Sequence, residues 1–387
     1  MPKTASITER LAALGSEKWA VHFDARKRKA LGEHIIELTI GEPDIPTPTH
    51  LLDVASDAMH AGRTRYSGGK GELTLREALA QKYAKRSGRA IHADQVLAFP
   101  GTQAALTICT LALVEKGDDV LVPDPYYATY EAVVGASGAG FFPVPTSPQN
   151  GFHLTADQLE SCVTPSSKVL LLNSPHNPTG AVLNRDEILA IGEVCRKHDL
   201  WIVSDEVYES LIYESTFSSA FDEISLADRT IVTSSISKSH AAPGFRSGWC
   251  VGPEKFIAKA QPVSEAILFG NQPFIADMTT HALLHPDDTA QRMSMAYRRR
   301  IQLIMEIFAD SNTLKPIKPH AGMFMLLDVS GSGMDGGEFA KKLLDQESVA
   351  TMPGDAFGAQ AKDFIRLSLT VDDELLAEGA RRMLNLN

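Results

Sequence analysis

Short, almost wholly apolar runs alternate with amphipathic stretches through the middle of the chain. Such runs predict strands that are buried on both faces of a sheet. The stretch Arg185–His198 between two of them has helical periodicity, and Asn184 with Glu187 forms a capping box at its start. Strand, helix and strand in that order predict βαβ units and a mostly parallel α/β sheet. The predicted strands are Asp119–Pro123, Lys168–Asn173, Leu200–Ser204 and Thr230–Ser234.

The pattern changes on either side of this region. A stretch rich in proline, Gly41–Pro48, separates the first segment from the predicted sheet, and a new pattern begins after about Phe274. There the polar helical stretch Asp287–Ala309 precedes two strand-like runs, Met323–Val329 and Phe364–Leu369. We therefore expect a large domain at residues 46–280 and a smaller α+β domain formed by residues 1–45 and 281–387.

Composition changes this picture little and excludes some functions. The chain has 387 residues, of which 44% are hydrophobic and 22% charged, as in ordinary globular proteins. A net charge of −11 argues against binding nucleic acid or anionic lipid through a broad basic surface. The first residues do not resemble a signal peptide, and no apolar run reaches the roughly 20 residues that span a bilayer. We expect a cytoplasmic enzyme.

The four cysteines are widely spaced and lie in apolar surroundings. They form no C-x-x-C pair, so buried reduced thiols explain them better than disulfides or a metal site. We predict no metal. The residues are Cys109, Cys162, Cys195 and Cys250.

Ser235-Ile-Ser-Lys238 is the sharpest candidate for chemistry. A lysine at a strand end can act as a nucleophile when its amine is partly desolvated and deprotonated. A lone lysine is usually a solvated surface charge instead. Here Arg246 follows eight residues later between Gly244 and Gly248, where it can reach an anion beside the lysine. The Ser235 hydroxyl can bind the same anion.

Asp205 and Tyr208 follow directly after a predicted buried strand. Asp205 is the type of residue that a cationic pyridinium nitrogen requires, since a charge pair at about 4 Å is worth about 4 kcal/mol at an effective dielectric near 20. Tyr208 is spaced to donate its hydroxyl to an oxygen on the same ring. A helix N-cap is the ordinary alternative for Asp205.

Two loops offer further polar groups. Asn173–Gly180 contains prolines and a glycine that fix a turn at a strand end, from which Asn177 can donate to a phenolic oxygen or a carboxylate. Gly101 leads into an apolar helix whose first N–H groups, at Thr102 and Gln103, suit a phosphate. Each loop alone is an ordinary structural feature more often than a site.

An aromatic pair and one arginine complete the candidates. Tyr126 and Tyr127 offer a face on which a ring can stack, although core packing is their ordinary role. Arg366 lies inside an apolar strand, where its planar guanidinium matches a carboxylate with two hydrogen bonds. An internal salt bridge is the alternative for Arg366.

Together, and in this order, these segments resemble the fold-type I, class I/II aminotransferases from about Ile36 to the C-terminus. The resemblance implies a PLP-dependent transferase fold with a seven-stranded sheet, the cofactor pyridoxal 5′-phosphate (PLP), an amino-acid donor, a 2-oxo acid acceptor and a homodimer with shared active sites. It implies that Lys238 bonds covalently to PLP, that Asp205 pairs with the ring nitrogen, and that Asn177 and Tyr208 hold the ring oxygen.

The remaining roles also follow from the resemblance. Gly41, Asn177 and Arg366 would take the substrate α-carboxylate, and Tyr66 would reach the phosphate bound by the neighbouring subunit. The cofactor-binding residues would further include Thr102, Gln103, Tyr127, Ser235 and Arg246. Tyr127 departs from the pattern, because many relatives have tryptophan or phenylalanine there. Within the family, four stretches are most similar to arginine–pyruvate transaminases: Trp19–His22, Asn173–Gly180, His198–Glu206 and Ser234–Gly248.

The sequence leaves two other functions open. The same scaffold supports a C–S β-lyase, which would release pyruvate and ammonia from cystathionine without an oxo-acid acceptor. A PLP-sensing transcription regulator is the non-enzymatic alternative, but it needs an added DNA-binding module, and the catalytic pattern already begins near residue 36. Which amino acid is the donor is not evident from the sequence.

Overall fold

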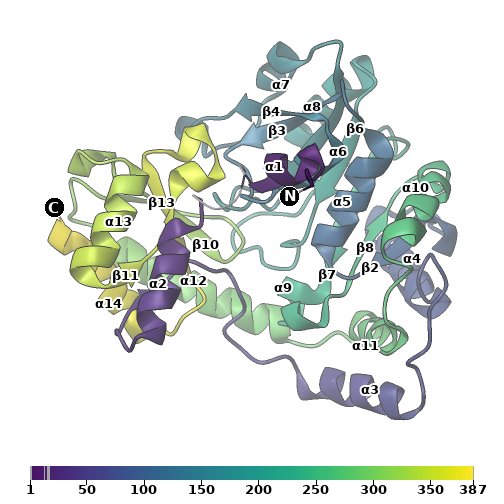
Figure 1. Ribbon diagram of the computed structural model, residues 1–387, viewed down its shortest axis with the longest axis horizontal. Helices are drawn as coiled ribbons and strands as arrows, with labels where there is room; N and C mark the ends of the chain where they lie inside the picture. The colour runs from purple at the N-terminus through teal and green to yellow at the C-terminus, as the bar shows by residue number, and fades with distance from the viewer. Residues whose placement is uncertain (1, 13, 15–17, 387) are drawn as a thin grey trace.

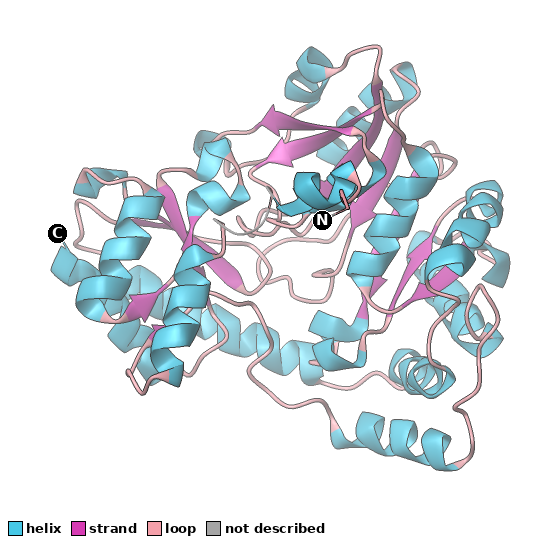
Figure 2. Ribbon diagram, viewed as in Figure 1, coloured by secondary structure: helices cyan, strands magenta, loops and turns pink. Residues whose placement is uncertain are grey.

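The computed structural model describes residues 2–12, 14 and 18–386. It has a large and a small domain (Figure 1), and Figure 2 shows the strands of the large domain crossing between layers of helix. The helices are α1 Ser6–Ala12, α2 Ala20–Ala30, α3 Thr49–His60, α4 Leu73–Ser87, α5 Thr102–Leu113, α6 Tyr130–Ser137, α7 Ala156–Cys162, α8 Arg185–Lys197, α9 Ile236–Ser239, α10 Glu254–Ile267, α11 Pro273–Leu284, α12 Thr289–Ile307, α13 Gly336–Glu347 and α14 Asp373–Met383.

The large domain is built on one seven-stranded sheet. Its order is β2-β8-β7-β6-β5-β3-β4; β8 runs antiparallel to both neighbours, and the pairs from β7 to β4 are parallel. The predicted mostly parallel sheet is therefore confirmed. The strands are β2 Val96–Phe99, β3 Asp119–Asp124, β4 Gly140–Pro145, β5 Ser167–Asn173, β6 Trp201–Asp205, β7 Thr230–Ser235 and β8 Gly248–Val251.

Both faces of this sheet are covered, as the continuous apolar runs require. Successive side chains of β5 point to opposite faces: Val169 and Leu171 join the core shared with α5, α6 and α10, whereas Leu170 and Leu172 join the core shared with α8. The predicted capping box at the start of α8 is present, since Asn184 accepts from the Glu187 N–H at 3.0 Å.

The small domain packs α12, α13 and α14 around a four-stranded antiparallel sheet of order β12-β13-β10-β9 and a short parallel pair, β1 with β11. Helix α2 contacts α13 of this domain, whereas α1 contacts α6 of the large domain. The strands are β1 Ile36–Glu37, β9 Lys315–Ile317, β10 Phe324–Asp328, β11 Val349–Ala350, β12 Met352–Pro353 and β13 Phe364–Ser368.

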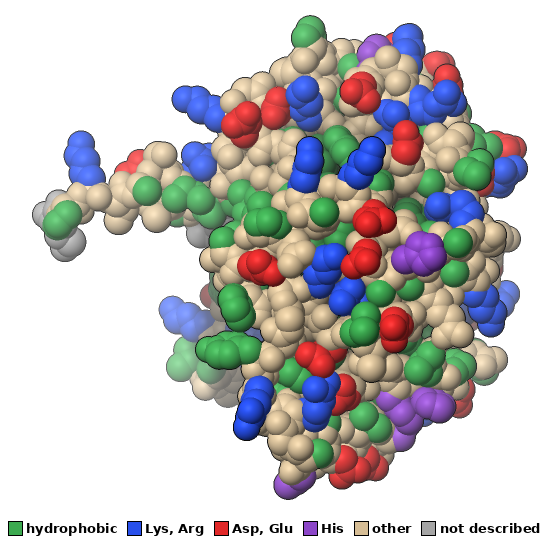
Figure 3. Space-filling model, turned by 90° about the vertical axis from the view of Figure 1, so that its right-hand side faces the viewer, with side chains coloured by type: hydrophobic (Ala, Val, Ile, Leu, Met, Phe, Trp, Pro, Cys, Tyr) green, Lys and Arg blue, Asp and Glu red, His purple; other side chains and the backbone are tan. Residues whose placement is uncertain are grey.

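Surface features agree in part with the sequence analysis. Acidic and basic side chains are interspersed on the face in Figure 3. Among the described residues, no helix has the length and hydropathy needed to cross a bilayer. All four thiols are free, but Cys162 is only half-buried, because it lies in the last turn of the surface helix α7; the expectation of burial is wrong for that thiol.

Candidate active site

A cavity of about 410 Å³ lies where the carboxyl ends of β5, β6 and β7 meet the start of α5 and the small domain. Asn173, Asp205 and Ser235 each end one of these parallel strands, so their side chains reach the same edge of the sheet. The small domain adds Phe324 from β10 and Arg366 from β13. The cavity therefore collects polar side chains from distant parts of the chain.

Lys238 lies in the one-turn helix α9, directly after β7. The Ser235 side chain caps this turn by accepting from the Ser237 N–H at 3.3 Å, and Lys238 Nζ donates to the Gly41 carbonyl at 2.6 Å. Burial lowers the pKa of Lys238 to about 8; the charge of Glu42 opposes this shift, and the charges of Arg366 and Arg246 add to it. Near pH 8 about half of such amines are neutral, which is the form that can act as a nucleophile or a base.

Asp205 places its carboxylate at the floor of the cavity. Oδ2 accepts from the Tyr130 hydroxyl at 2.8 Å, and Oδ1 accepts from the Val207 N–H at 3.3 Å. Among the described residues, no salt bridge includes Asp205, and burial raises its pKa to about 6. No helix starts at Asp205, so it is not the N-cap that its sequence context allowed. The buried carboxylate is suited to a cationic ligand.

Asn177 connects Tyr208 with Arg366 along one wall. Its amide nitrogen lies 3.5 Å from the Tyr208 hydroxyl, and its oxygen accepts from Arg366 Nη1 at 3.0 Å. Asn173 fixes the loop, because its Oδ1 accepts from the Asn177 N–H at 2.8 Å and its amide donates to the Asp205 carbonyl at 2.8 Å. The wall thus offers a hydroxyl and an amide to a ligand above Asp205.

The start of α5 forms a cationic and hydrogen-bonding end of the cavity. Gly101 has φ +94°, and a side chain there would lie 2.2 Å from Nη2 of Arg246, so only glycine lets the guanidinium reach the helix start. The first N–H groups of α5 have no carbonyl partner within the helix. Thr102 Oγ1 is also buried without a hydrogen-bond partner among the described residues. These donors suit a phosphate.

Arg366 is a buried cation that has no carboxylate partner within the described chain. Its guanidinium lies 4.0 Å from the ring centre of Phe324 and 4.5 Å from that of Phe357, and it donates to the Thr39 carbonyl at 2.6 Å. Burial lowers its pKa to about 10. The internal salt bridge considered from sequence is therefore absent, and the arginine remains available to a ligand carboxylate.

The structure brings almost all of the predicted site residues together. Eleven line the cavity: Gly41, Thr102, Gln103, Tyr127, Asn177, Asp205, Tyr208, Ser235, Lys238, Arg246 and Arg366. Tyr66 does not, since it is 88% exposed and its ring contacts that of Phe269 instead.

The lining residues that sequence reasoning missed include Tyr130, Phe324, Trp19 and Glu42. Tyr130 begins α6, and its ring contacts that of Tyr127 in the preceding loop, with the ring centres 5.6 Å apart. Phe324 begins an apolar strand, so its sequence context predicted only a buried core residue. Glu42 follows the predicted site residue Gly41, which was a usable signal, whereas nothing in the local pattern around Trp19 indicates its place at the cavity.

Comparisons with known proteins agree with this geometry. A family model described as aminotransferase class I and II matches residues 33–383. The chain is 40% identical to arginine–pyruvate transaminase of Pseudomonas aeruginosa over 98% of this chain and 96% of that one. It is 32% identical to an aspartate aminotransferase of Geobacillus stearothermophilus, covering 97% and 98% of the two chains. The solved structure of Thermus thermophilus aspartate aminotransferase with maleate superposes with a TM-score of 0.93 at 30% identity, covering 100% of each chain.

Proposed function

The chain belongs to the class I and II aminotransferases, and from that premise we propose that it transfers the amino group of L-arginine to pyruvate. It is a PLP-dependent aminotransferase that passes amino groups to 2-oxo acids. One cavity joins Lys238, Asp205 and Arg366, which is the arrangement that this activity needs. The named substrates are the finer proposal, and the relative at 40% identity supports them.

The residues present fit PLP. We propose that Lys238 makes the covalent link, that Asp205 faces the ring nitrogen, and that Asn177 and Tyr208 hold the ring oxygen. The unpartnered Thr102 hydroxyl at the start of α5 is the observation that supports a phosphate there. Gln103, Ser235 and Arg246 would complete the phosphate site, and Tyr127 would stack on the ring.

Bound PLP supplies the electron sink for breaking bonds at the donor Cα. The protein residues then have two tasks. The Lys238 amine, when not bonded to PLP, would take the proton from Cα, and its lowered pKa keeps a useful neutral fraction at physiological pH. Arg366, with Asn177 and the backbone at Gly41, holds the α-carboxylate and so fixes the direction of the Cα–H bond.

Arg366→Lys is expected to raise the donor KM by about 10- to 100-fold with a smaller change in kcat, because an ammonium cannot reproduce the two parallel hydrogen bonds of a guanidinium. Steady-state kinetics with the preferred donor measures both constants. Arg300→Lys is the matched control, since Arg300 is also buried but already pairs with Asp44 and Asp373. An unchanged KM in Arg366→Lys would contradict the assignment.

Charge in the cavity supports a monocarboxylate acceptor. Among the described residues that line it, the cationic side chains are Lys238, Arg246 and Arg366, and each has a role in the proposal above. A second carboxylate, as in 2-oxoglutarate, would meet no further cation from this chain. Glu42, which is exposed at the cavity and has no salt bridge or hydrogen bond among the described residues, favours a donor with a cationic side chain.

An amino-donor panel tests the substrate proposal. Arginine, lysine, alanine and aspartate are each offered with pyruvate and with 2-oxoglutarate, and product 2-oxo acids are measured. We expect arginine with pyruvate to give the highest kcat/KM, and 2-oxoglutarate to be poorer by at least about tenfold. Preference for aspartate or for 2-oxoglutarate would refute the proposed substrates, arginine and pyruvate, but not the assignment as an aminotransferase.

We also propose a homodimer with shared active sites. Tyr66, Ile267 and Phe269 are exposed apolar side chains, 88%, 56% and 58% accessible, on segments that lie next to one another. Exposed apolar groups gathered in this way are typical of an interface. From there the Tyr66 hydroxyl would reach the phosphate of the neighbouring subunit. A monomer in sedimentation equilibrium, with full activity, would contradict this.

The relatives reported above give no support to a C–S lyase or to a PLP-sensing regulator, because their names describe aminotransferases. We propose that the enzyme acts in the cytoplasm on small amino and oxo acids, without nucleic acid or membrane partners. The interspersed surface charge and the net charge of −11 support this.

A further inference from the structure

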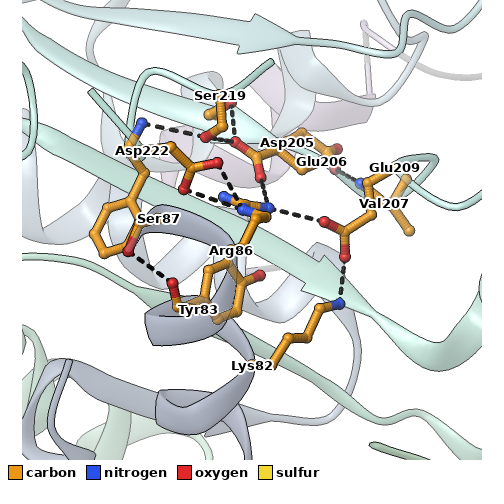
Figure 4. A network of polar contacts seen from close by, with 12 residues as sticks. Lys82, Tyr83, Arg86, Ser87, Asp205, Glu206, Val207, Glu209, Ser219 and Asp222 are labelled. Atoms are coloured by element: carbon orange, nitrogen blue, oxygen red, sulfur yellow. Dashed lines mark hydrogen bonds and ion pairs between the residues drawn. The ribbon is translucent and has the colours of Figure 1, made fainter. Parts of the chain in front are cut away.

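A buried ionic cluster lies beside the segment that follows β6 (Figure 4). Arg86, near the end of α4, is at its centre. Arg86 Nη1 donates to Glu206 and to Glu209, each at 2.8 Å, and Nε donates to Asp222 Oδ1 at 3.0 Å. The hydroxyls of Ser204 and Ser219 donate to Oε1 of Glu206, the carboxylate oxygen that Arg86 does not contact. Lys82 pairs with Glu209. We call Arg86, Lys82, Glu206, Glu209 and Asp222 the Arg86 cluster.

The Arg86 cluster is costly to bury, so its presence calls for a reason beyond stability. The Glu206 side chain is 1% exposed, and burial raises its pKa to about 7. Burial alone would lower the pKa of Arg86, but the charges of Glu206 and Glu209 raise it. Removing Arg86 would leave Glu209 with Lys82 and would leave the buried Glu206 without a salt bridge among the described residues. The cluster therefore depends on the arginine.

Chain connectivity links the Arg86 cluster to the cavity. Glu206 is the neighbour of Asp205, and Glu209 is the neighbour of Tyr208. Adjacent extended residues point to opposite faces, so Glu206 turns to Arg86 while Asp205 turns to the cavity. Backbone bonds hold the same turn: the Glu206 N–H donates to the Thr233 carbonyl at 2.9 Å, the Glu209 N–H donates to the Glu206 carbonyl at 3.0 Å, and the Tyr208 carbonyl accepts from the Leu211 N–H at 2.9 Å.

We propose that Arg86 is a positioning residue for the transamination site: through Glu206 and Glu209 it fixes the Asp205 carboxylate and the Tyr208 hydroxyl against the cofactor ring. One arginine holds both carboxylates, so it sets the spacing between the two cavity-facing groups. This inference rests on the proposed roles of Asp205 and Tyr208. Arg86 itself touches neither substrate nor cofactor.

Arg86→Met tests the proposal in the intact enzyme. The pH midpoint of the absorbance change of bound PLP reports the protonation of the nitrogen that joins PLP to Lys238. A displaced Asp205 stabilises the proton on the PLP ring nitrogen less well. Loss of that positive charge makes the nitrogen that joins PLP to Lys238 more basic, so we expect the pH midpoint to rise by about half a pH unit or more. The kcat should fall by about 10²-fold while the donor KM, set by Arg366, changes by less than about threefold.

A second variant separates positioning from folding. In Arg86→Met with Glu206→Gln, the uncompensated buried charge is gone, so the thermal midpoint should recover. The contacts from Arg86 to residues 206 and 209 are still missing, so the raised pH midpoint and the low kcat should persist. If the pH midpoint and the kcat return to their native values when the thermal midpoint recovers, Arg86 has only a structural role and the proposal is wrong. The same holds if folded Arg86→Met keeps the native pH midpoint.

Two further variants complete the experiment. Arg185→Met removes an exposed arginine that pairs with Glu223 through two nitrogens, and it should leave every readout unchanged. Asp205→Asn should raise the pH midpoint directly. If Asp205→Asn has no effect, the proposed role of Asp205 fails; if it acts and Arg86→Met does not, only the positioning role fails.

Discussion

Lys238→Ala is expected to lower the rate of amino-group transfer by about 10⁴-fold or more while the protein still binds PLP. Among the described residues that line the cavity, Lys238 carries the one amine, and the variant loses both the proposed covalent link and the proposed base for the Cα proton. The phosphate and ring contacts proposed for the start of α5 and for Asp205 are untouched. Single-turnover kinetics with the amino donor measures the loss.

Borohydride treatment gives a second readout for the same variant. In the native enzyme, reduction should fix PLP to the peptide that contains Lys238, and mass spectrometry of digests should find no such adduct in Lys238→Ala. Lys168→Ala is the matched control, because Lys168 is an exposed lysine on β5 of the same sheet. Retained transamination in Lys238→Ala, or an adduct at another lysine, would refute the assignment.

Much of the large domain follows from local patterns. Continuous apolar runs predicted the strands β3, β5, β6 and β7 because both faces of a parallel sheet are buried. Once these strands are parallel, their carboxyl ends share one edge, which is why Asn173, Asp205 and Ser235 could be expected together before any coordinates.

Contacts between distant segments could not be predicted in this way. Tyr130 bonds Asp205 across 75 positions of sequence, and the guanidinium of Arg366 lies between the rings of two phenylalanines from other segments. From the sequence, Arg366 could pair with an internal carboxylate or with a ligand carboxylate. Deciding between these roles requires knowing every side chain packed around the guanidinium, and local sequence does not give that. The Arg86 cluster had no local signal, since charges on α4 look like an ordinary solvated face until the helix is placed.

Asp205→Asn is expected to slow the amino-donor half-reaction by about 10³-fold. An ion pair at about 4 Å and an effective dielectric near 20 is worth about 4 kcal/mol, and a neutral amide loses this stabilisation of the protonated ring. The substitution is nearly isosteric, so the contact with Tyr130 and the fold should persist. Stopped-flow absorbance with the donor measures the rate.

The kinetic pattern of Asp205→Asn distinguishes an electrostatic role from a loss of structure. The donor KM should stay within about threefold of the native value, because Arg366 and Asn177, the proposed α-carboxylate site, are unchanged. Asp199→Asn is the matched control: Asp199 is 98% exposed and lies just before β6, at the opposite end from Asp205. A native rate in Asp205→Asn would mean that another group keeps the ring protonated. Since no other carboxylate lies at the cavity floor among the described residues, we expect the loss.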